Sequence, residues 1–124
     1  MPFQCPECST RTLKITHKLE LPPDSRSDEI TLQIVECSRC NFGAIAVYEE
    51  SRRGALNDDS FDHTGYRIGA DDLAALRKAI RACPRPTNHR CTCATHRKLG
   101  TRSKSGRWNG LAGVHHESAF GMRF

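Results

Sequence analysis

Apolar residues recur at every second position in the first part of the chain. In residues 12–21 they stand at Leu13, Ile15, Leu19 and Leu21, a set predicted to share one face of a β-strand. Residues 29–36 alternate in the same way, and the run 42–48 is apolar and rich in β-forming residues. Between the first two segments, the Pro-, Ser- and Asp-rich stretch 22–28 predicts an exposed loop. Together these segments predict an antiparallel β meander.

Residues 71–82 carry their apolar residues at helical spacing instead. The stripe consists of Leu73, Leu76 and Ile80, with Cys83 one turn further along. Asp71 or Asp72 can cap the N-terminus, and basic residues fall toward the C-terminal end, where the helix dipole favours them. Pro84 then ends this helix, and the pattern predicts no other.

Length and composition limit how large a core the chain can build. Its 124 residues suit one small domain, and 37% of them are hydrophobic. Because a core this thin often depends on metal, disulfides or a partner, we expect a small α+β domain stabilised by metal. Its predicted parts are a zinc-binding β meander at residues 1–53, the helix and a second metal site at 54–97, and an irregular, partly flexible basic tail at 98–124. Within the second part, the Gly- and Asp-rich stretch 54–69 is assigned no strand.

Four of the seven cysteines form two close pairs, Cys5 with Cys8 and Cys37 with Cys40. A two-residue gap lets both sulfurs of one turn reach a single ion, and the 28 residues between the pairs match a β-hairpin with its loop. Four thiolates in a tetrahedron suit Zn²⁺. Since four protein ligands leave no open position for water or substrate, the predicted role of the metal is structural.

This arrangement resembles a zinc ribbon, in which two such turns flank a β-hairpin and meet at its base. The resemblance covers residues 3–50 and implies the fold and the metal, but zinc ribbons serve transcription, translation, RNA modification and scaffolding alike. Rubredoxin-like iron is the rival, because rubredoxins pair two such turns at a similar separation. Ser9 and Asn41 stand where rubredoxins usually have glycine, which favours zinc.

The other three cysteines lie close to a histidine after the predicted helix. Cys83, Cys91, Cys93 and His96 predict a second closed site, of the Cys₃His type, so that two Zn²⁺ ions are expected. His89 could replace His96, although the gap from Cys93 to His96 gives the shorter chelate. The alternative is a set of ordinary or redox-sensitive thiols in a basic loop.

No secretory signal is apparent, and no run approaches the roughly 20 apolar residues of a membrane span. We therefore expect a cytoplasmic protein with no membrane partner. Because the cytoplasm keeps thiols reduced, its cysteines are expected to be metal ligands rather than disulfide partners.

Charge is divided unevenly along the chain. Residues 1–72 hold eight Lys/Arg against thirteen Asp/Glu, whereas residues 73–124 hold eleven against one. Seven basic residues without an intervening acid, followed by Trp108 as a ring for base stacking, predict binding of RNA or single-stranded DNA. The predicted phosphate contacts are Arg85, Arg90, Arg97, Lys98, Arg102, Lys104 and Arg107.

Two other uses of the tail remain open. The first is a protein–protein adaptor or immunity-like protein, which would dock an acidic partner through its apolar C-terminal residues and the acidic face of the ribbon. Those apolar residues are Leu111, Val114, Phe120, Met122 and Phe124. The second is that the basic tail folds back onto the acidic part of its own chain.

No pattern of catalytic residues is found, so the chain is not expected to be an enzyme. His115, His116 and Glu117 together suggest acid–base or metal chemistry, but such a run is interpreted as solvated polar sequence. His17 shares the apolar face of its predicted strand and is interpreted as a hydrogen-bonded packing residue, not a ligand.

Overall fold

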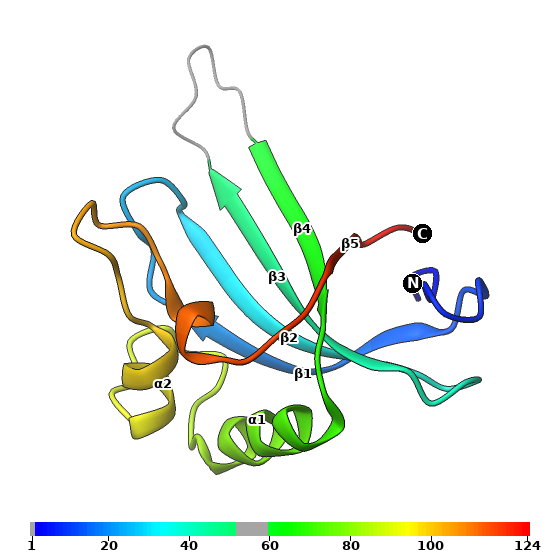
Figure 1. Cartoon of the computed structure of the whole chain (residues 1–124). Helices are drawn as coiled ribbons and strands as arrows, with labels where there is room; N and C mark the ends of the chain where they lie inside the picture. Colours follow the sequence, from blue (N-terminus) through cyan, green and yellow to red (C-terminus); the bar gives the residue numbers. More distant parts are fainter. Residues whose placement is uncertain (1, 52–59) are drawn as a thin grey trace.

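A computed structural model describes residues 2–51 and 60–124 of the protein. Its central feature is one antiparallel β-sheet (Figure 1). Its five strands lie in the order β1-β2-β3-β4-β5, and every neighbouring pair is antiparallel. The elements are β1 (Leu13–Leu21), β2 (Glu29–Cys37), β3 (Gly43–Ser51), β4 (Ser60–Arg67), α1 (Ala70–Ala82), α2 (Ala94–Leu99), the 3₁₀ helix η2 (Gly110–Gly113) and β5 (Ala119–Gly121). The predicted α+β class and the first three strands are thus confirmed. Among the described residues, no helix combines the length and the apolarity that crossing a membrane requires.

Both faces of the sheet are covered. The helices cover one, here called the helix face, where the buried strand residues include Leu19, Leu32, Ile34 and Ile45. The other, here called the terminal face, is covered by the two ends of the chain and buries Phe3, Leu13, Val35, Ala44 and Ala46. Because successive strand residues point to opposite faces, the inner strand β2 is buried at nearly every position. Its buried polar side chains are hydrogen-bonded, Thr31 to Glu20 and Gln33 to His63.

A β-bulge in β1 overturns one prediction. Leu13 and Ile15 pack on the terminal face, whereas Leu19 and Leu21 lie in the cluster of the helix face, so the four residues do not share one face. The register with β2 shifts between Ile15 and His17. The extra residue reverses which face every later side chain of the strand occupies, an effect that a period-two pattern cannot reveal.

The strand β4 was not predicted from the sequence. Its residues are mostly polar and include Gly65, so they show no apolar alternation. Pairing with β3 along the whole strand, from Ala44 opposite Arg67 to Ser51 opposite Ser60, supplies the hydrogen bonds that the side chains do not specify. Residues 54–59, to which the sequence also assigned no strand, lie outside the described residues.

The helix α1 begins without the predicted cap. Gly69 is the N-cap residue and makes no side-chain capping bond, while Asp71 and Asp72 lie in the first turn. A carboxylate there still faces the positive end of the helix dipole. The predicted stripe is confirmed, because the buried residues of α1 are Leu73, Leu76 and Ile80.

The tail is more ordered than predicted. It contains the end of α2, η2 and β5, and β5 pairs with β4 through Gly65 opposite Phe120. The helix α2 itself begins at Ala94, before the tail, and was not predicted. Leu111 and Val114 pack on the helix face, and Phe120 and Met122 on the terminal face. Most of the apolar residues that suggested docking of a partner are therefore used within the chain, whereas Phe124 stays 63% exposed.

Candidate metal centres and basic surface

The first cysteine cluster lies at the open end of the β1–β2 hairpin, where Leu13 pairs with Cys37. The sulfurs of Cys5, Cys8, Cys37 and Cys40 all lie within 4.8 Å of one another. The Sγ atoms of Cys5 and Cys40 are 3.5 Å apart, and those of Cys8 and Cys37 are 3.7 Å apart. Tetrahedral zinc with Zn–S bonds of about 2.3 Å places its sulfurs about 3.8 Å apart, so this donor set fits such an ion.

Two threonine hydroxyls, which no sequence pattern indicated, lie beside sulfurs of this first centre. Thr10 Oγ1 lies 3.0 Å from Cys8 Sγ, and Thr12 Oγ1 lies 3.0 Å from Cys37 Sγ. The Thr10 hydroxyl lowers the pKa of Cys8. Burial raises the pKa of Cys37, but the Thr12 hydroxyl and nearby N–H groups outweigh burial and lower it to about 6. Donors of this kind favour the thiolate that a metal requires.

The residue after each cysteine pair has an unusual backbone conformation. Ser9 has a φ of 62° and Asn41 a φ of 60°, both in the left-handed region that favours glycine. Within the described chain they are the two non-glycine residues with positive φ. Both turns therefore have the backbone conformation that glycine favours, although neither has glycine at this position. The missing glycines are thus no argument for zinc over rubredoxin-like iron.

The second cluster brings together residues from three places after the sheet. Cys83 is the C-cap residue of α1, Cys93 is the N-cap residue of α2, and His96 lies in the first turn of α2. With Cys91 from the intervening loop, their donor atoms lie within 4.8 Å of one another. The Nδ1 atom of His96 is 3.2 Å from Cys83 Sγ and 3.3 Å from Cys93 Sγ.

His96, not His89, belongs to this group. His96 is 4% exposed, and its Nε2 lies 2.9 Å from the backbone carbonyl of Glu20, whereas His89 is exposed. An Nε2–H that donates to this carbonyl leaves the Nδ1 lone pair for the metal.

The cysteines of the second centre differ in how far their surroundings favour the thiolate. The backbone N–H of His96 lies 3.4 Å from Cys93 Sγ and is the main cause that lowers the pKa of Cys93, to about 6. Burial raises the pKa of Cys83 to about 11. An ion bound here would join α1, the loop and α2, because its ligands come from all three.

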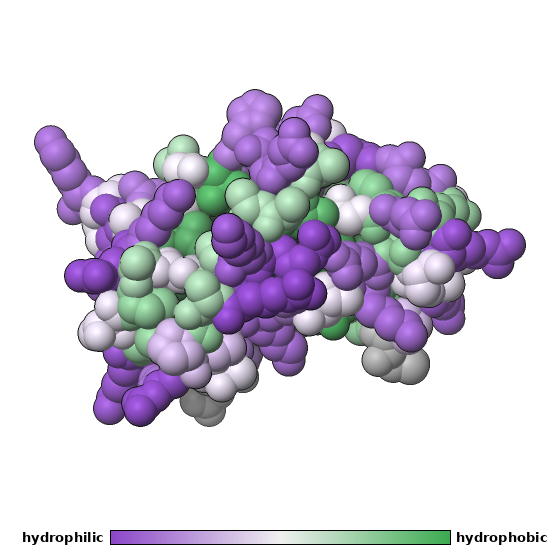
Figure 2. All heavy atoms as spheres, turned by 90° about the horizontal axis from the view of Figure 1, so that it is seen from below, coloured by the Kyte–Doolittle hydropathy of each residue, from purple (hydrophilic) through white to green (hydrophobic). Residues whose placement is uncertain are grey.

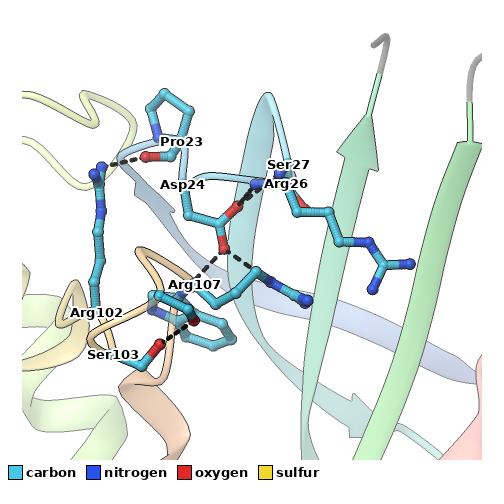
Figure 3. Close-up of polar contacts among 9 residues, drawn as sticks. Pro23, Asp24, Arg26, Ser27, Arg102, Ser103 and Arg107 are labelled. Atoms are coloured by element: carbon cyan, nitrogen blue, oxygen red, sulfur yellow. Dashed lines mark hydrogen bonds and ion pairs between the residues drawn. The ribbon is translucent and has the colours of Figure 1, made fainter. Parts of the chain in front are cut away.

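The tail is fastened to the 22–28 loop by the residues predicted to bind nucleic acid (Figure 3). The side chain of Asp24 is fully buried, and its carboxylate accepts the backbone N–H of Trp108 at 2.7 Å and lies 3.7 Å from Arg107 Nε. The guanidinium of Arg102 donates to the carbonyl of Pro23. The structure thus directs part of the basic tail onto its own chain, one of the uses left open by the sequence.

Trp108 has its polar atoms and part of its ring in internal contacts. The indole Nε1 donates to the carbonyl of Leu99 at 2.6 Å, and the ring packs against the core of the helix face. Its ring is half-buried, so less of it faces solvent than base stacking by a free ring requires.

The other five predicted phosphate contacts remain in solvent. Arg85, Arg90, Arg97, Lys98 and Lys104 are exposed, and none forms an ion pair with the residues described. Four of them follow or precede a ligand of the second centre by at most two residues, so a metal there would fix where their backbones lie. Seen from the side of α1 and α2, hydrophilic side chains cover most of the surface, with apolar atoms between them (Figure 2).

The remaining histidines do not join a metal cluster within residues 2–51 and 60–124. His17 lies on the helix face and accepts a hydrogen bond from Arg81 Nε at 3.2 Å, which agrees with its interpretation as a hydrogen-bonded packing residue. His115 is exposed, and its Nδ1 lies 3.3 Å from a carboxylate oxygen of Asp72.

Comparison of the chain with protein-family models, with curated proteins and with solved structures finds no match.

Proposed function

We propose that both clusters bind Zn²⁺ and that the two ions are structural, the first in a zinc-ribbon-like setting. Support comes from the donor sets, which are four thiolates and three thiolates with one imidazole at tetrahedral spacing. When bound, the ions would supply rigidity where the tail and the loop around residues 84–92 have few apolar residues. Thiolate centres of this kind persist where thiols stay reduced, so a cytoplasmic location belongs to the same proposal.

We further infer that the protein binds single-stranded nucleic acid on the surface around the second centre. The observation that carries this inference is a group of four exposed cations within two residues of the Cys₃His cluster, none of which forms an ion pair with a described residue: Arg85, Arg90, Arg97 and Lys98. Cations held on a metal-stabilised segment meet phosphates with less loss of conformational entropy than cations on a mobile tail. An accessory role in transcription, translation or RNA handling fits this chemistry.

Fluorescence anisotropy tests this function. Labelled single-stranded RNA, single-stranded DNA and duplex DNA are titrated over a salt series. We expect binding to the single strands to weaken as salt rises, and replacing the four cations by Gln to lower the logarithmic salt slope by roughly 3, since each phosphate contact on a single strand contributes about 0.7. The matched control replaces four exposed cations outside the segment 83–98, Arg11, Lys14, Lys18 and Arg39. An equal decrease in both variants, or no binding at low salt, contradicts the proposal.

A second candidate function has its own observation on the terminal face. Ring contacts there run without a break along Phe61, Tyr48, His63, Phe3 and Phe124. Phe61 is 70% and Phe124 63% exposed, which suits the docking of a protein partner as an adaptor would require. Truncating the tail would not test this, because it would also remove β5. The sharper comparison is partner capture by Phe61→Ser/Phe124→Ser against capture by the four-cation variant, with loss in the first variant alone supporting the adaptor.

A further inference from the structure

A hollow lies against the outer side of the second metal centre. It has a volume of about 510 Å³, within the range of small-ligand sites. Its walls come from the Pro22–Pro23 loop, the segment before α2 and the end of α2 itself. The lining includes Cys91 and His96, so two ligands of the centre form part of its floor.

The hollow is lined by arginines and by no carboxylate of the described residues. Arg90 and Arg97 line it, and neither forms an ion pair within the described part of the chain. The guanidinium of Arg102, bonded to the carbonyl of Pro23, adds a third arginine close to the proline wall. Cations that line the same hollow repel one another, and an anion bound among them offsets this repulsion.

The surroundings of the hollow are held in place before any ligand arrives. Two prolines, with fixed φ and no N–H group, form one wall. On the other side, the hydrogen bond from His96 to the Glu20 carbonyl fixes the first turn of α2, and Arg97 follows directly. The backbone N–H of Arg90 donates to the Asn88 side chain at 3.0 Å. The arginines therefore project from an ordered backbone, which reduces the entropy lost on binding.

We propose that this hollow binds a phosphate group held jointly by Arg90 and Arg97, and that it is the point where a bound strand is anchored. The second clause rests on the proposed function, whereas the first does not. Arginine forks match the geometry of phosphate oxygens and hold them through paired, charge-assisted hydrogen bonds. The phosphate belongs either to the end or interior of a strand or to a free phosphate ion.

The first test uses inorganic phosphate and the zinc-loaded full-length protein. Arginine Nε–Hε signals are followed by NMR during the titration, with chloride at equal ionic strength as the control. We expect saturable shifts for Arg90 and Arg97 and none for Arg85. Shifts that are equal at all exposed arginines, or that chloride reproduces, overturn the pocket even if the protein binds nucleic acid.

The second test compares two variants with the same change in charge. Arg90→Gln/Arg97→Gln removes the pocket cations, and Arg85→Gln/Lys104→Gln removes two exposed cations that do not line the hollow. Both should keep two metal equivalents. We expect the first to weaken binding of a single-stranded octanucleotide by about tenfold or more beyond the second, as the loss of charge-assisted hydrogen bonds implies. Equal losses overturn the anchoring role.

The same titration identifies the source of the phosphate. A 5′-phosphorylated octanucleotide that binds more tightly than its 5′-hydroxyl form, in the wild-type protein alone, assigns a terminal phosphate to the hollow. Equal affinity of the two forms, together with the loss in the pocket variant, assigns an internal one. If no oligonucleotide binds while phosphate still shifts Arg90 and Arg97, the pocket stands and the nucleic-acid function fails.

Discussion

The Nε2 atom of His96 lies 2.9 Å from the backbone carbonyl of Glu20, while its Nδ1 faces the sulfurs of Cys83 and Cys93. One imidazole therefore connects the second metal cluster to β1, in which Glu20 lies. The hydrogen bond fixes the ring orientation and leaves Nδ1 as the metal donor. The second centre is thereby held to the sheet as well as to the helices.

Replacing His96 should remove one of two bound metal ions. His96→Ala leaves three thiolates, and we expect the zinc content of purified protein to fall from two equivalents toward one, with a lower melting temperature. Elemental analysis and thermal unfolding measure both. His89→Ala is the matched control and should keep two ions, because His89 lies outside the cluster. A protein that loses metal equally in both variants would refute the assignment.

Removing a hydroxyl beside the first centre should weaken its metal binding without removing a ligand. Thr12→Val deletes the donor 3.0 Å from Cys37 Sγ, and we expect metal affinity at this site to fall by about tenfold, as is typical for a partner of a ligand. Competition with a chromophoric chelator measures the change. Thr16→Val, which removes a hydroxyl from an exposed residue of β1, should leave the affinity unchanged.

Glycine in either left-handed turn should stabilise the protein. In Ser9→Gly the strain of a φ of 62° is relieved, and we expect a gain on the order of 1 kcal/mol in the free energy of unfolding, after the entropy cost of glycine. Asn41→Gly should gain less, because asparagine tolerates this region better. Ser38→Gly, in the second turn but without positive φ, should not stabilise. Denaturant unfolding of the zinc-loaded protein separates the three.

The buried Asp24 carboxylate should make attachment of the tail depend on pH. Burial raises the pKa of Asp24, but the N–H group of Trp108 and the other donors outweigh burial and leave this pKa below its ordinary value. A lowered folded pKa stabilises the folded state above the unfolded value, near 4, and that stability is lost as the pH falls through the folded pKa. Asp24→Asn should thus cost about 1–3 kcal/mol at pH 7, and the difference from wild type should shrink in acid.

Trp108, the single tryptophan of the chain, makes this change measurable. Its fluorescence should shift to the red in Asp24→Asn at neutral pH, as the indole leaves the core of the helix face. Asp71→Asn is the control, since that exposed carboxylate also lies in the first turn of α1, whereas its neighbour Asp72 contacts His115 of the tail. An unchanged spectrum in Asp24→Asn would show that the carboxylate does not hold the tail.

The packing of β5 on β4 depends on a glycine, Gly65, opposite Phe120. A Cβ added at Gly65 would lie 2.4 Å from the ring of Phe120, so Gly65→Ala should push the ring away and destabilise the fold by about 1–3 kcal/mol. The same substitution in a Phe120→Ala background should cost clearly less, because the clash is gone. Gly113→Ala, where nothing lies within 4 Å, serves as the neutral control. Equal costs with and without Phe120 would contradict this account.

The sequence by itself determined the features that depend on near neighbours. Apolar residues at a period of two or along a helical stripe predicted three strands and α1, because such patterns follow from backbone geometry alone. The short gaps between cysteines selected both metal clusters, since a chelate depends on a few bonds of chain. The favoured choice of His96 over His89 came from the same argument, and the structure agrees with it.

Only the tertiary structure decided the features that depend on residues far apart in the chain. The bulge between Ile15 and His17 appears only when β1 is matched to β2, and β4 is a strand because β3 pairs with it. The tail residues Arg107 and Trp108 are held by Asp24, more than eighty positions earlier, so their charge and ring could not be assigned to a partner from composition. Local periodicity carries no information about such pairings, which are selected by the packing of the whole chain.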